Sequence, residues 1–289
     1  MRGTGIALVT PFKKDLSIDF DALARIIDHV INGGVEYVVA LGTTGESPTL
    51  SKDEKKKVYS FISEHVKGRV PCVAGIGGND THEVVDTIKA FDFSKFDAVL
   101  SVSPYYNKPN QEGIFQHYME LAKVSPKPII IYNVPGRTGS LVAASTTLRL
   151  ANASDKFIAT KEASGSAEQF MDILKDKPSK FSVISGDDNL TLPYLAMGMS
   201  GVISVIGNAF PKDFSEMVRL GLKGDFEAAR KLHFKLYEAM KTIFADGSPG
   251  GIKVILNELG LCENIVRLPL AAVNAGVENK LRQLAKSLL

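Results

Sequence analysis

The sequence predicts an α/β fold, a single (β/α)8 barrel followed by a C-terminal helical extension. Three observations lead to this fold class: eight short apolar runs recur along the chain, segments with helical periodicity alternate with them, and no Pro/Ser-rich linker divides the series. A doubly wound open sheet is the alternative arrangement of such units. We expect the barrel to occupy residues 1–224 and the helical extension residues 225–289.

The eight apolar runs have the length and composition of short buried strands. They cover residues 6–9, 37–41, 70–74, 98–102, 129–132, 157–160, 181–184 and 202–205. Because a helical segment follows each run, the strands are expected to be parallel and covered by helices.

Helical periodicity is clearest after the first run, where one face would be lined by Phe20, Leu23, Ile26, Ile27, Val30 and Ile31. A capping-box pattern at Ser51-Lys52-Asp53-Glu54 marks the start of the next helix, and Gly68 is expected to end it. In the extension, one helical stripe is formed by Phe226, Ala229, Leu232, Leu236 and Met240. We interpret its methionine and aromatic content as packing rather than as a cofactor site.

Charge and cysteine content narrow the range of functions. Lys+Arg number 34 and Asp+Glu 32, and the charges are interspersed, so no basic face for nucleic acid is expected. Cys72 and Cys262 are far apart and lie in largely apolar surroundings, as free thiols of a reducing compartment do. No apolar run approaches the ~18 residues of a membrane span. We therefore expect a cytoplasmic protein that acts on small molecules, with neither a nucleic-acid nor a membrane partner.

Polar residues cluster directly after several of the predicted strands. In a barrel of this kind the site lies at the carboxyl ends of the strands, so these residues would meet on one face. They are Gly42-Thr43-Thr44-Gly45-Glu46, Ser103-Pro104-Tyr105-Tyr106-Asn107, Tyr132-Asn133-Val134-Pro135-Gly136-Arg137-Thr138-Gly139, Lys161, and Ser185-Gly186-Asp187-Asp188. An amine, hydroxyls to relay protons and donors to hold a carboxylate make a complete set for imine chemistry.

Lys161 is the central candidate. It closes the sixth run, where apolar neighbours disfavour its charged form and make a neutral, nucleophilic amine available for attack on a carbonyl. The alternative is a strand-end lysine that pairs with a carboxylate such as Glu162. Tyr132 could likewise be a core tyrosine and Arg137 a surface arginine. Their joint placement after strand ends favours the chemical interpretation.

Metal and cofactor chemistry find little support in the sequence. The five histidines, His29, His65, His82, His117 and His233, fall one per segment in helical patterns rather than after strands. Gly75-Ile76-Gly77-Gly78 lacks the Rossmann spacing and a Walker lysine, so we interpret it as a turn. We expect neither a metal nor an organic cofactor.

The motifs Gly42-Thr43-Thr44-Gly45-Glu46, Tyr132 to Gly139 and Lys161-Glu162-Ala163 together resemble the 4-hydroxy-tetrahydrodipicolinate synthase (dihydrodipicolinate synthase) family. This family belongs to a class I aldolase superfamily that includes N-acetylneuraminate lyase. The resemblance runs from about Gly5 to the C-terminus. It implies a (β/α)8 barrel with a C-terminal helical domain and a homotetramer built as a pair of dimers.

The resemblance also implies a role for each matching residue. Lys161 would form the imine with pyruvate, and the proton relay would consist of Tyr132, Thr43 and Tyr106, the last reaching into the neighbouring subunit's site. Pyruvate and L-aspartate 4-semialdehyde would be held by Thr44, Arg137, the backbone carbonyl of Ile203, and Gly186. The implied reaction condenses the two substrates and cyclises the product, as the opening step towards diaminopimelate and lysine.

Two other functions compete with this synthase. One is a sibling aldolase acting on a sugar acid, such as N-acetylneuraminate lyase or a keto-sugar-acid aldolase. The other is a catalytically silent barrel used for binding. Sugar-acid lyases of the superfamily generally lack the arginine that matches Arg137 and carry serine in place of Thr43, so these two residues favour the synthase. The complete set of Lys161, Tyr132 and Thr43 argues against a silent barrel.

The resemblance extends to a regulatory site at the dimer interface of lysine-inhibited members. Its matching residues are Ser47, Asn79, Glu83 and Tyr105, with Lys52 and Lys55 where those members carry two histidines. Two ammonium groups would repel the cationic end of lysine, whereas neutral histidines can accept a hydrogen bond from it. We expect weak or absent feedback inhibition, although Glu83 and Tyr105 could still hold the amino-acid end.

Overall fold

The computed structural model describes all 289 residues and contains eight parallel strands closed into a barrel. The strands are β1 (Gly3–Ala7), β2 (Tyr37–Ala40), β3 (Cys72–Gly75), β4 (Ala98–Val102), β5 (Ile129–Asn133), β6 (Phe157–Glu162), β7 (Ser182–Ser185) and β8 (Gly201–Ser204). Each strand pairs with the next one in sequence, and β8 pairs with β1. The predicted (β/α)8 barrel is therefore confirmed, and the open doubly wound sheet is wrong.

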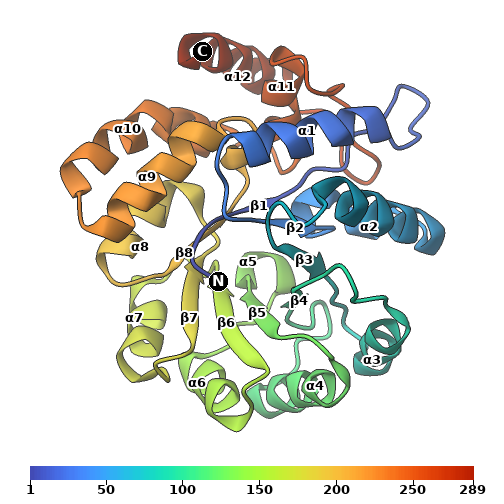
Figure 1. Cartoon of the computed structure of the whole chain (residues 1–289), viewed down its shortest axis with the longest axis vertical. Helices are drawn as coiled ribbons and strands as arrows, with labels where there is room; N and C mark the ends of the chain where they lie inside the picture. The colour runs from blue at the N-terminus through green and yellow to red at the C-terminus, as the bar shows by residue number, and fades with distance from the viewer.

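A helix follows every strand and covers the outside of the barrel (Figure 1). These helices are α1 (Phe20–Asn32), α2 (Lys52–Val66), α3 (Thr81–Ala90), α4 (Gln111–Val124), α6 (Ala144–Ala153), α7 (Ala167–Asp176), α8 (Thr191–Ala196) and α9 (Pro211–Lys223). Short elements sit in the strand-to-helix loops, namely η1 (Thr43–Gly45), η2 (Ser47–Thr49), α5 (Pro135–Thr138), η3 (Asp188–Leu190) and η4 (Ile206–Asn208).

The predicted capping box at the start of α2 is confirmed. The Ser51 hydroxyl accepts the Glu54 N–H at 3.2 Å, and the Glu54 carboxylate accepts the Ser51 N–H at 2.9 Å. These two bonds provide acceptors for backbone N–H groups at the start of the helix, which have no partner within the helix itself. At the other end Lys67 is the cap residue with a φ of 50°, and Gly68 follows it with a φ of 69°, so the helix ends at the expected glycine.

The predicted start of the first strand is wrong, because β1 begins at Gly3 rather than at residue 6. Gly3 faces Gly201 of β8 in the register, and a Cβ atom on Gly201 would lie 2.0 Å from the Gly3 carbonyl oxygen. The two backbones approach so closely that only glycine fits at Gly201. A strand that begins with glycine is not detected from apolar runs alone. The other strand boundaries lie within two residues of the prediction, and those of β4 match it at both ends.

Two apolar cores lie on the two sides of the sheet. Successive side chains of a strand point to opposite faces, so residues two apart share a face. Ile130 and Tyr132 of β5, together with Ala159 of β6, belong to the cluster inside the barrel. Lys161 lies two residues after Ala159 and so faces the interior as well. The larger core fills the space between the barrel and its helices.

The C-terminal part of the chain forms α10 (Phe226–Thr242), α11 (Gly250–Glu258) and α12 (Ala275–Leu288). The predicted stripe on α10 is confirmed, because Ala229, Leu236 and Met240 are fully buried. The segment after α11 lies beside α1, where the Arg25 guanidinium donates to the Leu261 carbonyl at 3.2 Å (Figure 1). The boundary expected after residue 224 falls in the turn between α9 and α10, and we keep that division as a proposal.

Both cysteines are buried free thiols, as expected. Burial raises the pKa of the Cys72 and Cys262 thiols to about 12 in each case, which suppresses the reactive thiolate. None of the helices has the length and apolar character that crossing a bilayer requires.

Candidate active site

Lys161 and Tyr132 lie side by side at the carboxyl ends of neighbouring strands. The register of β5 and β6 pairs Tyr132 with Lys161, and the lysine Nζ is 4.3 Å from the centre of the tyrosine ring. Both side chains are buried, with exposed fractions of 7% and 6% for Tyr132 and Lys161. An ammonium over an aromatic face is favourable, and the phenol hydroxyl supplies a proton donor or acceptor beside the amine.

The alternative role of Lys161 as the ion-pair partner of Glu162 is wrong. Glu162 is the next residue of β6 and points to the other face of the sheet. Its two carboxylate oxygens accept the Asn133 side-chain N–H groups at 3.0 Å, and one of them accepts the Ser164 N–H at 3.0 Å. Burial raises the pKa of Glu162, while these hydrogen bonds oppose the shift. The chain's lysine ion pairs do not include Lys161.

Gly186 leaves room for the stem of Lys161. The Gly186 N–H donates to the Glu162 carbonyl at 2.8 Å, which draws the loop after β7 against the end of β6. A Cβ atom at this position would lie 3.2 Å from Lys161 Cε and 2.6 Å from the Ala163 Cβ. Any side chain on Gly186 would therefore push against the lysine or the backbone next to it.

Asp188 belongs to the polar residues after the predicted seventh strand, but the sequence assigns it no role. It is fully buried in η3, and its carboxylate accepts the backbone N–H groups of Val205 at 3.1 Å and Ile206 at 2.8 Å. Burial raises its pKa to about 6, although these bonds and the nearby Lys161 charge pull in the opposite direction. Asp188 thus fixes the chain just after Ile203, the residue expected to offer its carbonyl to the substrate.

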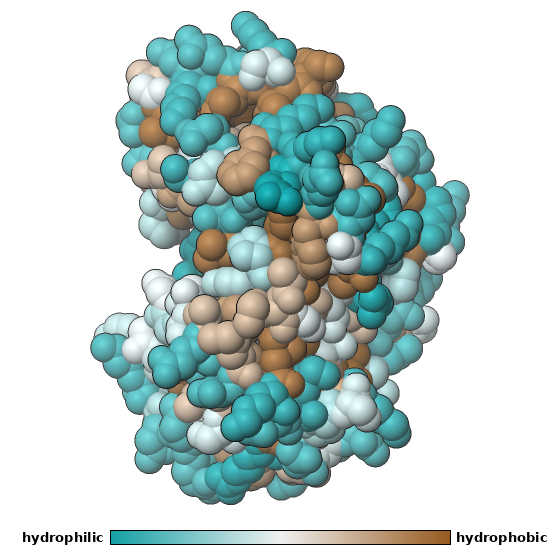
Figure 2. Space-filling view, turned by 90° about the vertical axis from the view of Figure 1, so that its left-hand side faces the viewer, coloured by the Kyte–Doolittle hydropathy of each residue, from teal (hydrophilic) through white to brown (hydrophobic).

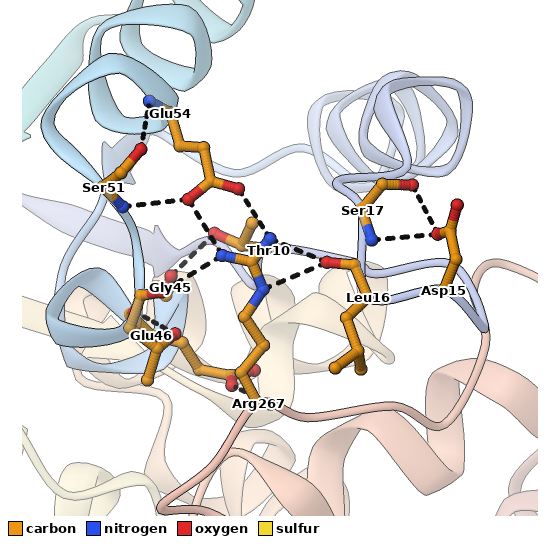
Figure 3. Close-up of polar contacts among 10 residues, drawn as sticks. Thr10, Asp15, Leu16, Ser17, Gly45, Glu46, Ser51, Glu54 and Arg267 are labelled. Carbon is orange, nitrogen blue, oxygen red and sulfur yellow. Dashed lines mark hydrogen bonds and ion pairs between the residues drawn. The ribbon is translucent and has the colours of Figure 1, made fainter.

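Thr43 and Thr44 form the start of η1, directly after β2. Strand β2 is four strands away from β6 in the closed barrel, so the threonines lie across the barrel mouth from Lys161. Thr44 is buried and Thr43 half-buried. The Thr10 hydroxyl donates to the Gly45 carbonyl at 2.7 Å, which ties η1 to the segment after β1 (Figure 3). Ile203 lies in the interior cluster with Tyr132.

Tyr106 and Arg137 lie on the surface, in adjacent loops. The Tyr106 N–H donates to the Thr138 carbonyl at 3.3 Å, while the Tyr106 side chain is 87% exposed. Arg137 in α5 is also exposed, and the chain's arginine ion pairs do not include it. Within one chain these two residues do not join the interior cluster of Tyr132 and Ile203.

The residues matched to the regulatory site lie on the loops and helices that follow β2, β3 and β4. They are Ser47 in η2, Lys52 and Lys55 in the first two turns of α2, Asn79 before α3, Glu83 in the first turn of α3, and Tyr105 after β4. Two of these loops touch, because the Asn107 side chain donates to the Asn79 carbonyl at 3.2 Å. Lys52 is exposed and Lys55 is half-buried.

The histidines lie on separate helices, α1, α2, α3, α4 and α10, as the sequence predicts. No group of three or more His, Cys, Asp or Glu side chains is placed to hold a metal ion. The glycine segment after β3 is closely packed, since a Cβ atom on Gly77 would lie 2.9 Å from the Val102 backbone nitrogen. This packing accounts for that glycine without a phosphate group.

A (β/α)8 barrel with a buried lysine beside a tyrosine at the strand ends defines the class: an enzyme equipped for Schiff-base chemistry. The model of the dihydrodipicolinate synthetase family matches residues 1–288. The chain therefore belongs to the dihydrodipicolinate synthetase family.

Similar proteins cover the whole chain. The 4-hydroxy-tetrahydrodipicolinate synthase of Flavobacterium psychrophilum is 56% identical over 286 residues, which are 99% of this chain and 98% of the relative. The crystal structure of dihydrodipicolinate synthase from Aquifex aeolicus is 40% identical, with a TM-score of 0.95, and the match covers 99% of this chain and 97% of that one. The enzyme from Cyanidioschyzon merolae, solved with lysine bound, is 34% identical with a TM-score of 0.94, over 99% and 98% of the two chains.

The close contact at Gly186 generates a prediction. Gly186→Ala should lower kcat/KM for pyruvate at least tenfold, because the new methyl group displaces Lys161 or Ala163. Steady-state kinetics measure the effect. Gly276→Ala, at an exposed position in the first turn of α12, is the matched control and should leave the kinetics unchanged. Wild-type kinetics for Gly186→Ala would show that the loop after β7 does not constrain Lys161.

Proposed function

We propose that this protein condenses pyruvate with L-aspartate 4-semialdehyde to give 4-hydroxy-tetrahydrodipicolinate, through an imine on Lys161. The observation that carries the proposal is the Lys161 amine, buried at the barrel mouth and 4.3 Å from the Tyr132 ring, with no carboxylate paired to it. Relatives that match this chain over its full length carry the name of this synthase. The product would feed diaminopimelate and lysine synthesis, and we place the enzyme in the cytoplasm.

The proposed reaction begins with attack of the neutral Lys161 amine on C2 of pyruvate. The resulting carbinolamine loses water and becomes an imine, and removal of a proton from the pyruvate methyl group gives an enamine. The enamine carbon attacks the aldehyde carbon of the second substrate and forms the new carbon–carbon bond. The aldehyde oxygen takes up a proton in that step and becomes the hydroxyl group. The amino group of that substrate then attacks C2 and passes a proton to the departing Lys161 amine, and the ring closes as a cyclic imine.

We assign the proton transfers to Tyr132, Thr43 and Tyr106, and the substrate contacts to residues around them. Thr44 would hold the pyruvate carboxylate, and Arg137 the carboxylate of the semialdehyde. The Ile203 carbonyl and Gly186 would line the space between. The exposed Arg137 supports its role, since no carboxylate of the chain neutralises its guanidinium.

A sibling aldolase that acts on a sugar acid is the second candidate. Arg137 and Thr43 speak against it, because both match the synthase rather than the sugar-acid lyases. The third candidate, a silent barrel, does not explain a buried, unpaired lysine at the strand ends, because burying an amine without an ion-pair partner costs free energy.

We further propose a homo-oligomer, a tetramer built as a pair of dimers. Tyr106 needs a second copy, since its side chain is 87% exposed and lies outside its own barrel interior. Another face also carries exposed apolar residues, Met171 of α7 and Met197 after α8, and Figure 2 shows apolar side chains gathered across the middle of that side.

Sedimentation velocity should show a species of about four times the chain mass. A monomer at the enzyme's working concentration would contradict the proposal.

Covalent trapping tests the function directly. Borohydride should reduce the pyruvate imine to a stable amine on Lys161, so that mass spectrometry of peptides finds the adduct there, and Lys161→Ala should abolish it. Lys156→Ala is the matched control, since Lys156 lies just before β6 at the other end of the barrel and should leave the adduct intact. An adduct on a different lysine would refute the assignment.

Arg137→Leu tests the binding of the second substrate. The variant should use the semialdehyde less well by about 1.5 to 3 kcal/mol, the worth of a hydrogen bond to a charged group, while pyruvate trapping stays intact. Steady-state kinetics with each substrate varied in turn measure this difference. Unchanged semialdehyde kinetics would mean that another residue holds that carboxylate.

We propose that L-lysine inhibits weakly or not at all, although one structural relative was solved with lysine bound. The support is the pair of lysines, Lys52 and Lys55, near the start of α2, which add positive charge where a cationic inhibitor end would lie. The condensation rate at saturating pyruvate should hardly change when lysine is added. Strong, saturable inhibition at lysine levels well below those of the substrates would show that the charges do not block the site.

A further inference from the structure

One ion pair of the chain is completely removed from solvent. Lys253 of α11 and Glu46, the residue after η1, have side chains with 0% exposure, and the Lys253 Nζ donates to the Glu46 Oε1 at 2.5 Å. Every other ion pair leaves both partners at least 15% exposed. The two residues are 207 positions apart, so the C-terminal extension carries a charge into the loop after β2.

Both members of the buried pair have further hydrogen-bond partners. The other carboxylate oxygen of Glu46 accepts the Arg267 backbone N–H at 3.0 Å, and the Lys253 ammonium also donates to the Ile265 carbonyl at 2.7 Å. The same ammonium lies 4.3 Å from the centre of the Phe12 ring. These hydrogen bonds offset the cost of removing the two charges from water, so both can remain in an apolar interior.

The Arg267 side chain extends this network to the start of the barrel. Its guanidinium donates to the Leu16 carbonyl at 2.7 Å, to the Thr49 carbonyl at 3.1 Å and to the Glu54 carboxylate at 2.6 Å (Figure 3). Arginine pairing holds the pKa of Glu54 down at about 2. One residue of the extension thus joins the segment after β1, η2 and α2.

Glu46 itself has a backbone that a non-glycine residue rarely adopts. Its φ is 53°, in the left-handed region, and its N–H closes η1 by donating to the Thr43 carbonyl at 3.1 Å. A strained residue of this kind persists only where its surroundings hold it. The Lys253 ammonium and the Arg267 backbone N–H are the groups that hold the Glu46 side chain.

We propose that Lys253 and Arg267 are positioning residues for the reaction, acting through Glu46 to hold Thr43 and Thr44 at the barrel mouth. The proposal rests on the pyruvate-binding and proton-relay roles given to these threonines above. It makes the C-terminal extension a working part of the active site. A role in docking the extension alone would use the same contacts but would not affect pyruvate binding selectively.

A double substitution separates the two roles. Glu46→Gln or Lys253→Met alone leaves one buried group without its partner and should lower the melting temperature. The double variant removes both charges at similar volume, a change that buried ion pairs often tolerate, so its melting temperature should recover towards the wild-type value. Its kcat/KM for pyruvate should stay at least tenfold below wild type, while kcat/KM for the semialdehyde changes less than threefold.

Recovery of both the melting temperature and the pyruvate kinetics would overturn the proposal. If the double variant stays unstable, Arg267→Leu decides. It keeps the backbone N–H that Glu46 accepts but removes the guanidinium contacts to Leu16, Thr49 and Glu54 that place this N–H, and it leaves no fully buried charge unpaired. This variant should lower kcat/KM for pyruvate at least threefold without affecting the semialdehyde, and wild-type values would overturn the proposal.

Arg282→Leu is the matched control. Arg282 pairs with Glu258 and Glu278 within the extension, so its loss should lower stability but leave pyruvate kinetics unchanged. Borohydride trapping of pyruvate by the wild type runs alongside. Absence of that adduct would be a failure of the proposed function, whereas an adduct together with unchanged pyruvate kinetics in the variants would be a failure of the positioning role alone.

Discussion

The register of the closed parallel barrel is the constraint on which the site depends. It pairs Tyr132 with Lys161 across β5 and β6, and the alternation of side chains along each strand places both inside the barrel. A slip of one residue in β6 would turn Glu162 inward and Lys161 outward. The pairing of β1 with β8 at Gly3 and Gly201 closes the sheet and leaves the strands no edge along which to slide.

The Lys161 amine and the carboxylates near it differ in whether they have partners. The amine of Lys161 lies inside without an ion-pair partner, and two buried carboxylates near it, those of Glu162 and Asp188, are hydrogen-bonded by other groups. A third, Asp187, keeps one oxygen without a hydrogen bond, and the Lys161 charge opposes the rise in its pKa that burial causes. Asn133 bonds both oxygens of Glu162, and backbone N–H groups bond Asp188. Because these carboxylates are occupied elsewhere, the amine is left to react with a carbonyl ligand.

The sequence predicts the barrel and the placement of Lys161 because both depend on local signals, namely short apolar runs and the residue that follows each one. It does not predict that β1 starts at Gly3, since that start depends on close approach to another strand. It also does not predict the link between Glu46 and Lys253, which are distant in sequence and have no local pattern that relates them. The role that we propose for Tyr106 requires a second copy of the chain.

We propose that pyruvate becomes covalently bound to Lys161 while Thr44 holds its carboxylate. A crystal structure of the enzyme with pyruvate, solved without a reducing agent, tests it most directly. We expect continuous density from the Lys161 Nζ to C2 of the ligand, with the ligand carboxylate within hydrogen-bond distance of Thr44. Pyruvate bound without a covalent link, or linked to any other lysine, would contradict it.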